Sequence, residues 1–114
     1  MNITVNSRHV EITDAIRAYA REKTLKLGRY FDKILTAEII IDHDSGHNVV
    51  EVILKASHST FVGKYSGDDM YGCIDQAIHK VEEQIRRHKD KLRDHKATGL
   101  GEQAANAADQ EPNA

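Results

Sequence analysis

Residues 66–96 read SGDDMYGCIDQAIHKVEEQIRRHKDKLRDHK and carry the clearest structural pattern of the chain. At about 100° per residue, the apolar side chains of this stretch fall on one face of a helix. That face consists of Met70, Ile74, Ala77, Ile78, Val81, Ile85 and Leu92, with His88 at its edge. Ser66, Gly67 and Asp68 precede it and are typical of a helix start. The stretch therefore predicts a long helix with a buried apolar stripe.

Charged residues border this stripe in a sorted order. Helical spacing places basic residues on both flanks, with Lys80, Arg87 and Lys91 on one and Arg86, Lys89, Arg93 and Lys96 on the other. The opposite face collects Glu83, Asp90 and Asp94. Residues 86–96 hold six Lys or Arg against two Asp. A local basic field of this kind indicates a polyanionic ligand.

Composition limits the class of protein. The chain has 114 residues, of which 39% are hydrophobic and 30% charged, and these values fit one small domain. No apolar run approaches the roughly 20 residues needed to cross a bilayer, and the N-terminus lacks the pattern of a signal peptide, so we expect a cytoplasmic protein. Cys73 is the only cysteine, which excludes an internal disulfide.

The net charge of −2 does not exclude a nucleic-acid partner, because the charge is unevenly distributed. Residues 97–114 contain three acidic residues and no Lys or Arg, so residues 1–96 hold 16 basic and 18 − 3 = 15 acidic residues. The tail is also rich in small and polar residues without periodicity. We therefore expect a folded domain over 1–96 and a disordered tail over 97–114.

The remaining patterns predict one further helix and four strands. Alternation over 2–9 indicates a strand, and Thr13 and Asp14 start a helix that runs to about Phe31. Leu35, Ala37, Ile39 and Ile41 share one face of a second strand, the turn-rich segment 42–48 leads into a third over 50–56, and a fourth covers 60–65. The order β-α-β-β-β-α predicts an α+β two-layer sandwich, in which a four-stranded sheet carries both helices on one face. The open face would show Glu38, Ile40, Glu51, Ile53, Lys55, Val62 and Lys64.

The first predicted helix carries a strip that matches the basic flanks of the last one. Tyr19, Lys23, Lys26 and Tyr30 line one border of its apolar face. Lysines at such a border can rest their stems on the core and present ammonium groups to phosphates, while tyrosine hydroxyls can bond phosphate or ribose oxygens. Side by side, the two helices would form a positive groove. For either strip alone, ordinary surface lysines around a core are the simpler interpretation.

Other chemistry is disfavoured. The loop Asp42–His47 places two histidines and two aspartates close together, but a turn rich in Asp, Gly and Ser is an ordinary chain reversal, and we predict no metal there. The chain contains neither a nucleophile elbow nor a phosphate loop nor a dinucleotide fingerprint. We therefore predict no enzyme activity, no cofactor and no small-molecule substrate.

Two segments closely resemble the ribosome hibernation-promoting factors and their relative, the ribosome-associated inhibitor protein Y. They are NITVNSRHVEITDAIRAYAREKTLKLGRYFDKI, residues 2–34, and YSGDDMYGCIDQAIHKVEEQIRRHKDKLRDHK, residues 65–96. The resemblance implies the same sheet with two helices. It also implies binding to the small ribosomal subunit, its rRNA and whole ribosomes in the channel for messenger and transfer RNA, with inhibition of translation in starvation or stationary phase.

Carried over to this chain, the resemblance implies RNA contacts from Lys23, Lys26, Arg29, Lys80, Arg86, Arg87, Lys89 and Lys91, with Tyr71 as a further candidate. Long members of the family have an additional domain that pairs ribosomes, so the chain resembles a short form. Whether it promotes or opposes ribosome dimers stays open. The alternative function is a protein-interaction module that modulates an alternative sigma factor.

Overall fold

The structure is a computed structural model that describes residues 1–31 and 33–97. Its elements are β1 (Asn2–Arg8), α1 (Asp14–Tyr30), β2 (Ile34–Asp44), β3 (His47–Ala56), β4 (Thr60–Gly67) and α2 (Met70–Ala97). The chain divides into two compact units, Met1–Val81 and Glu82–Ala114. The first unit holds the sheet, α1 and the first part of α2, and the described part of the second is the remainder of α2. The predicted tail lies outside the described residues apart from Ala97, which ends α2.

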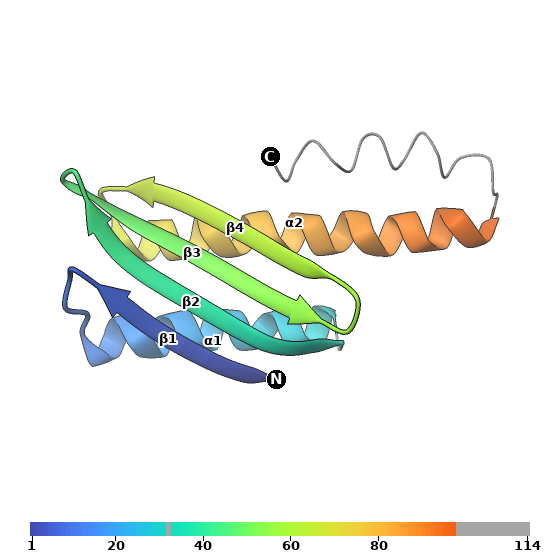
Figure 1. Ribbon diagram of the computed structural model, residues 1–114, viewed down its shortest axis with the longest axis horizontal. Coiled ribbons are helices and arrows are strands. Elements are labelled where there is room, and N and C mark those ends of the chain that lie inside the picture. Colours follow the sequence, from blue (N-terminus) through green and yellow to red (C-terminus); the bar gives the residue numbers. More distant parts are fainter. Residues whose placement is uncertain (32, 98–114) are drawn as a thin grey trace. The chain divides into compact units, whose positions relative to one another are not determined.

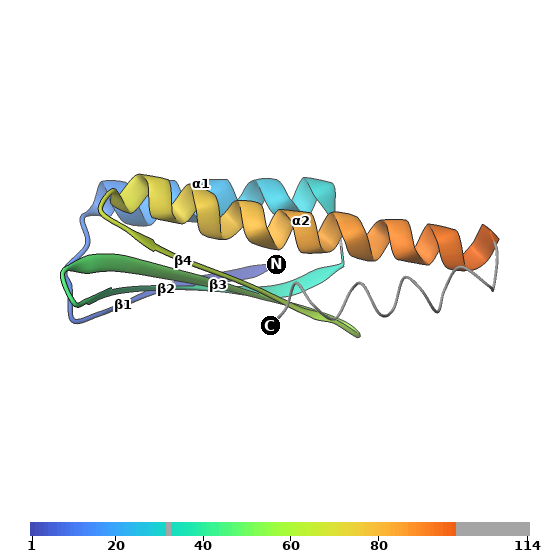
Figure 2. The same cartoon turned by 90° about the horizontal axis from the view of Figure 1, so that it is seen from above.

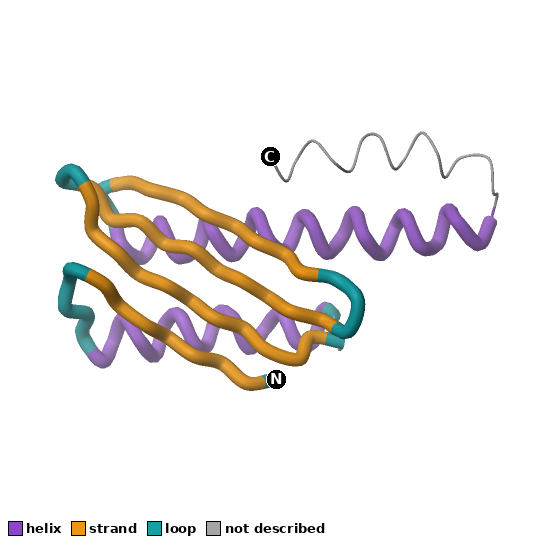
Figure 3. The backbone as a smooth tube through the Cα atoms, viewed as in Figure 1, coloured by secondary structure: helices purple, strands orange, loops and turns teal. Residues whose placement is uncertain are grey.

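The four strands form one mixed sheet in the order β1-β2-β3-β4. Strands β1 and β2 are parallel, with Val5 opposite Ile39, and α1 supplies the crossover that a parallel pair requires. The two later pairs are antiparallel, with Ile39 opposite Val52 and Val52 opposite Gly63. Figures 1 and 3 show α1 and α2 beginning at the end of the sheet where β1 ends. The predicted architecture is confirmed.

One face of the sheet is buried and carries both α1 and the first part of α2 (Figure 2). Because side chains alternate along a strand, every second residue points to the helices. The sheet contributes Val5, Ala37, Ile39, Ile41, Val50, Val52, Leu54 and Phe61 to the core. Helix α1 adds Ala20 and Leu27, and residues 70–81 add Cys73, Ile74, Ala77, Ile78 and Val81. The buried Thr24 hydroxyl donates to the Ala20 carbonyl at 2.7 Å, so its burial leaves no polar group unsatisfied.

Helix α1 has defined ends. The Thr13 hydroxyl accepts a hydrogen bond from the Ile16 backbone N–H at 3.1 Å and caps the first turn, as predicted. At the other end the Phe31 N–H donates to the Leu27 carbonyl at 2.9 Å. The Phe31 ring then meets the Phe61 ring of β4 edge to face, with centroids 5.9 Å apart. These contacts fix the length of α1 and its position on the sheet.

Gly63 allows the first part of α2 to approach β4 closely. A Cβ at this position would overlap the carbonyl oxygen of Ala77 and would lie 2.9 Å from Cγ2 of Val81. No side chain fits without displacing the helix backbone. The glycine therefore sets the distance between α2 and the edge strand on which the helix rests.

Two details of the prediction are wrong. Ser66 and Gly67 belong to β4, and α2 starts at Met70, with the Asp69 carbonyl accepting a 2.8 Å hydrogen bond from the Cys73 N–H. Leu35 is 56% exposed, because the pairing register of β2 shifts between Ile34 and Thr36. A shift of one residue exchanges the faces of a strand, so Ile34 takes the inward position.

The helical stripe predicted for α2 is otherwise buried. Its members Ile74, Ala77, Ile78, Val81 and Ile85 are at most 8% exposed. Met70 at the start of the helix is half-buried, and the side chain of Leu92 lies outside the described residues. Neither described helix is long and apolar enough to cross a membrane.

Candidate nucleic-acid interface

Three cations of α1 form a row along one flank of the helix. Lys23, Lys26 and Arg29 follow each other at intervals of three residues, which keeps them on neighbouring turns of the same side. Lys26 and Arg29 are exposed, and Lys23 is half-buried. The row therefore presents three positive charges from one rigid element, a spacing suited to successive phosphates of a nucleic-acid backbone.

Tyr19 sits at the start of this row and holds it against α2. Its hydroxyl donates a 2.7 Å hydrogen bond to Oδ1 of Asp75, and the Nζ of Lys23 lies 5.3 Å from the centre of its ring. The hydrogen bond to the Asp75 carboxylate, with burial next, raises the pKa of Tyr19 to about 12. In the structure this hydroxyl donates to an anionic acceptor, so the predicted bond from Tyr19 to a phosphate gains no support here. The residue instead positions Lys23.

Lys80 lies on the other flank of α2, away from Tyr71 and Asp75. Its Nζ donates a 2.9 Å hydrogen bond to the carbonyl of Lys64 on β4 and lies 5.5 Å from the centre of the Tyr65 ring. Lys80 therefore contacts β4, and the positive groove predicted between the two helices stays a prediction. The ammonium group reaches solvent beside the edge of the sheet.

The other four predicted contact residues belong to the second unit. Arg86 and Arg87 are exposed, and Lys89 and Lys91 are half-buried. All four lie within two turns of one continuous helix. The structure thus gathers the predicted residues into a row on α1, a single lysine beside β4 and a basic segment of α2.

An open pocket of about 490 Å³ lies between the first turns of α1 and α2. Ala15, Ala18, Tyr19, Glu22 and Tyr71 line it. The rings of Tyr19 and Tyr71 meet edge to face there, with centroids 4.9 Å apart. The sequence analysis missed this pocket, although Ala15 and Ala18 place small residues beside Tyr19 on one flank of α1. The missing signal was the partner ring, which comes from a distant part of the chain.

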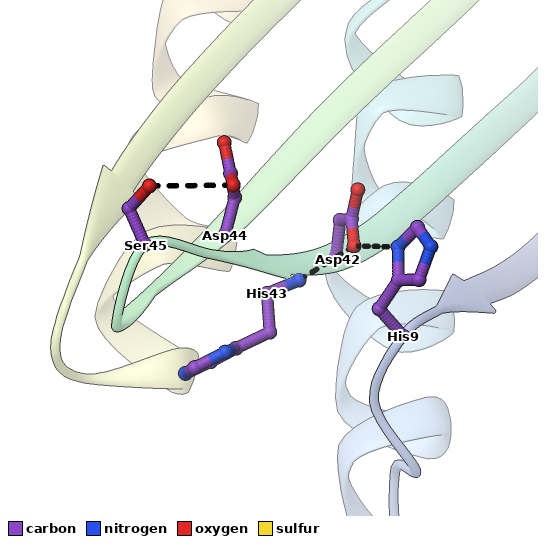
Figure 4. A network of polar contacts seen from close by, with 5 residues as sticks. All are labelled: His9, Asp42, His43, Asp44 and Ser45. Atoms are coloured by element: carbon purple, nitrogen blue, oxygen red, sulfur yellow. Dashed lines mark hydrogen bonds and ion pairs between the residues drawn. The ribbon is translucent and has the colours of Figure 1, made fainter.

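The loop that was weighed as a metal site does not gather its side chains (Figure 4). Asp42 pairs with His9 at 3.0 Å and accepts the His43 backbone N–H at 2.7 Å, while the His43 ring points away from that carboxylate. Asp44 bonds Ser45 at 3.4 Å. Among the described residues no three His, Cys, Asp or Glu side chains come together in a metal-binding arrangement. Ser45 and Gly46 instead adopt positive φ angles of 55° and 84°, which close the hairpin.

Comparisons with known proteins agree on one family. Residues 3–93 match the family model described as sigma 54 modulation protein / S30EA ribosomal protein. The chain is 32% identical to the ribosome hibernation promoting factors of Salmonella typhimurium and Escherichia coli K12, over 83% of this chain and 100% of each relative. It is 31% identical to that of Azotobacter vinelandii, over 80% of this chain and 85% of the relative.

Solved structures agree with the fold. A ribosomal subunit interface protein from Coxiella burnetii superposes with a TM-score of 0.74 at 28% identity, over 79% of this chain and 99% of that one. The N-terminal domain of Thermus thermophilus protein Y superposes with a TM-score of 0.70 at 31% identity, over 77% and 99%.

Proposed function

Because this chain belongs to the family of sigma 54 modulation proteins and S30EA ribosomal proteins, we propose that it is a ribosome-associated hibernation factor. It acts by binding and not by catalysis. The names of its relatives, ribosome hibernation promoting factor and ribosomal subunit interface protein, support this role. The domain that carries it comprises residues 1–96.

The binding surface in this proposal is the set of cations on the two helices. The row Lys23, Lys26 and Arg29 is the observation that carries it, because three basic side chains along one rigid flank can contact neighbouring phosphates of a nucleic-acid backbone. Lys80 and the segment Arg86, Arg87, Lys89 and Lys91 extend the contact. Such contacts fix position without reading sequence, so the RNA is recognised by its folded shape.

The site on the ribosome is the small subunit, in the channel that messenger and transfer RNA otherwise occupy. Occupying that channel inhibits translation without any chemical step. Idle ribosomes are stabilised in this way under stress or in stationary phase. The protein acts in the cytoplasm, with rRNA and whole ribosomes as its partners.

Sedimentation with purified ribosomes tests the proposal. The protein is mixed with 30S subunits, 50S subunits and whole ribosomes at low salt, and each gradient is assayed for the protein. Migration with 30S subunits and whole ribosomes is expected, and added messenger and transfer RNA should compete with it. Absence from both fractions, or migration with 50S subunits alone, would overturn the proposal.

The family description also supports a second candidate, a module that modulates an alternative sigma factor. A protein partner would use short-range contacts and would tolerate salt better than an rRNA contact does. Binding to a purified sigma factor that persists in the Lys23, Lys26 and Arg29 triple alanine variant would favour this alternative.

A further inference from the structure

The pocket between the first turns of α1 and α2 differs in chemistry from the row of cations beside it. Its lining combines the aromatic side chains of Tyr19 and Tyr71 with the small side chains of Ala15 and Ala18 and the carboxylate of Glu22. Tyr71 is 40% exposed, so its ring is accessible from solvent. Two of the five lining residues are therefore aromatic, and the ring of Tyr71 is open to solvent.

The charges around the pocket are mainly negative. Glu22 lines it, Asp75 accepts the hydrogen bond of the Tyr19 hydroxyl, and the charges of Asp75 and Asp69 both help to raise the pKa of Tyr19. Lys23, whose Nζ lies 5.3 Å from the centre of the Tyr19 ring, brings a positive charge beside them. Glu22 makes neither a hydrogen bond nor an ion pair with another described residue. Its carboxylate is available to a ligand.

We propose that this pocket binds an arginine side chain of a basic protein segment. A guanidinium stacks on an aromatic face and donates two parallel hydrogen bonds to a carboxylate, and the pocket offers both partners within one site. A phosphate would meet Glu22 and Asp75 with like charge, so a nucleotide fits this pocket less well. The same protein thus combines a basic surface for RNA with an acidic, aromatic pocket for a cationic side chain.

The identity of the partner rests on the proposed function, because a ribosome-bound protein meets basic extensions of ribosomal proteins. The pocket itself does not. The proposal fits the position of the site at one end of α1, where the cation row begins. Contacts with RNA and with protein would then follow each other along a single helix.

A titration of the isolated full chain tests the pocket without the ribosome. The probe is the peptide acetyl-Gly-Arg-Gly-Arg-Gly-amide, and the readout is the NMR shifts of the Tyr71 ring and the Glu22 carboxyl group. Saturable shifts are expected at both residues, with at least fivefold weaker binding in Glu22→Gln and in Tyr71→Leu. Glu11→Gln, an exposed carboxylate outside the pocket, should bind as the wild type does.

Guanosine monophosphate serves as the competing probe. If it shifts Tyr71 and Glu22 while the arginine peptide does not, the pocket binds a nucleobase and the proposal is wrong. Absence of shifts with either probe also overturns it. Equal effects of Glu22→Gln and Glu11→Gln would contradict the assignment to this pocket.

A ribosome assay separates the two proposals. Glu22→Gln should reduce affinity for 30S subunits three- to tenfold while leaving the salt dependence unchanged, because no phosphate contact is lost. If the wild type does not bind ribosomes but the peptide titration succeeds, the proposed function fails and the pocket stands. If the wild type binds ribosomes and Glu22→Gln changes neither its affinity for them nor its affinity for the peptide, the arginine pocket is refuted while the proposed function stands.

Discussion

The hydroxyl of Tyr19 on α1 donates a 2.7 Å hydrogen bond to the carboxylate of Asp75 on α2, across 56 residues of sequence. This contact links the two helices at their second turns. It also fixes the ring over which Lys23 lies, so the first cation of the α1 row is positioned by a residue of the other helix. Alignment of the row therefore depends on the pairing of the helices.

Asp75→Asn should lower the pKa of Tyr19 from about 12 toward the ordinary value of 10.0, because the hydrogen bond to the carboxylate is the main cause of the raised pKa. Titration of the phenol, followed by its ultraviolet absorbance, measures the pKa of Tyr19 in each variant. Tyr19→Phe, which has no phenol at this position, identifies the signal. A Tyr19 pKa that stays at about 12 in Asp75→Asn would contradict the account.

The same contact predicts a pH dependence of stability. A pKa raised in the folded state contributes stability that is fully present below pH 10 and is lost as the pH rises through 12. Tyr19→Phe should cost about 1 kcal/mol or less at neutral pH, since the hydrogen bond is partly exposed. Its unfolding free energy, measured with urea, should fall less steeply than that of the wild type above pH 10.

Gly63→Ala should destabilise the protein by about 1–3 kcal/mol or more, because the added methyl group overlaps the Ala77 carbonyl oxygen and displaces the helix from β4. The melting temperature of the variant measures this effect. Gly67→Ala, in the same strand, is the matched control: its Cβ would lie 3.4 Å from Sγ of Cys73, an ordinary van der Waals contact, so its melting temperature should stay close to that of the wild type. Equal melting temperatures for Gly63→Ala and the wild type would refute the close approach of α2 to β4.

His9→Gly should raise the pKa of the Asp42 carboxyl group. The hydrogen bond from His9 lowers that pKa below 3.8, followed by the hydrogen bond from the His43 N–H. A lowered pKa contributes stability above pH 3.8 that is lost as the pH falls through the folded-state value. Glycine retains the φ angle of 58° at position 9. Carboxyl ¹³C shifts through an acid titration measure the change, and an unaltered Asp42 curve would exclude the pairing.

Local patterns were sufficient to predict most of the fold. Alternation placed Ala37, Ile39 and Ile41 on the inner face of β2, and helical spacing placed Ile74 and Val81 in the stripe of α2; all five are buried. Both patterns reflect one buried face for each element, which a sequence displays directly. The prediction that Leu35 shares this inner face was wrong, because a register shift depends on pairing between strands and not on the strand's own sequence.

The site was harder to predict, since its properties come from pairs of residues distant in sequence. Spacing alone placed Lys23 and Lys26 on one border of α1, and only the family resemblance added Arg29 to them. The Asp75 acceptor that occupies the Tyr19 hydroxyl, and the Lys64 carbonyl that receives the Lys80 ammonium group, were not. Helical spacing shows which residues share a flank of one helix, but not which element faces that flank.

The most direct test of the account is the salt dependence of affinity for 30S subunits. The triple variant Lys23→Ala, Lys26→Ala and Arg29→Ala should bind more weakly and should reduce the slope of log affinity against log salt by about 2, with each lost phosphate contact contributing about 0.7–0.9. Lys55→Ala, on the open face of the sheet, should leave both quantities unchanged. An affinity and a slope equal to those of the wild type in the triple variant would contradict phosphate binding by the α1 row.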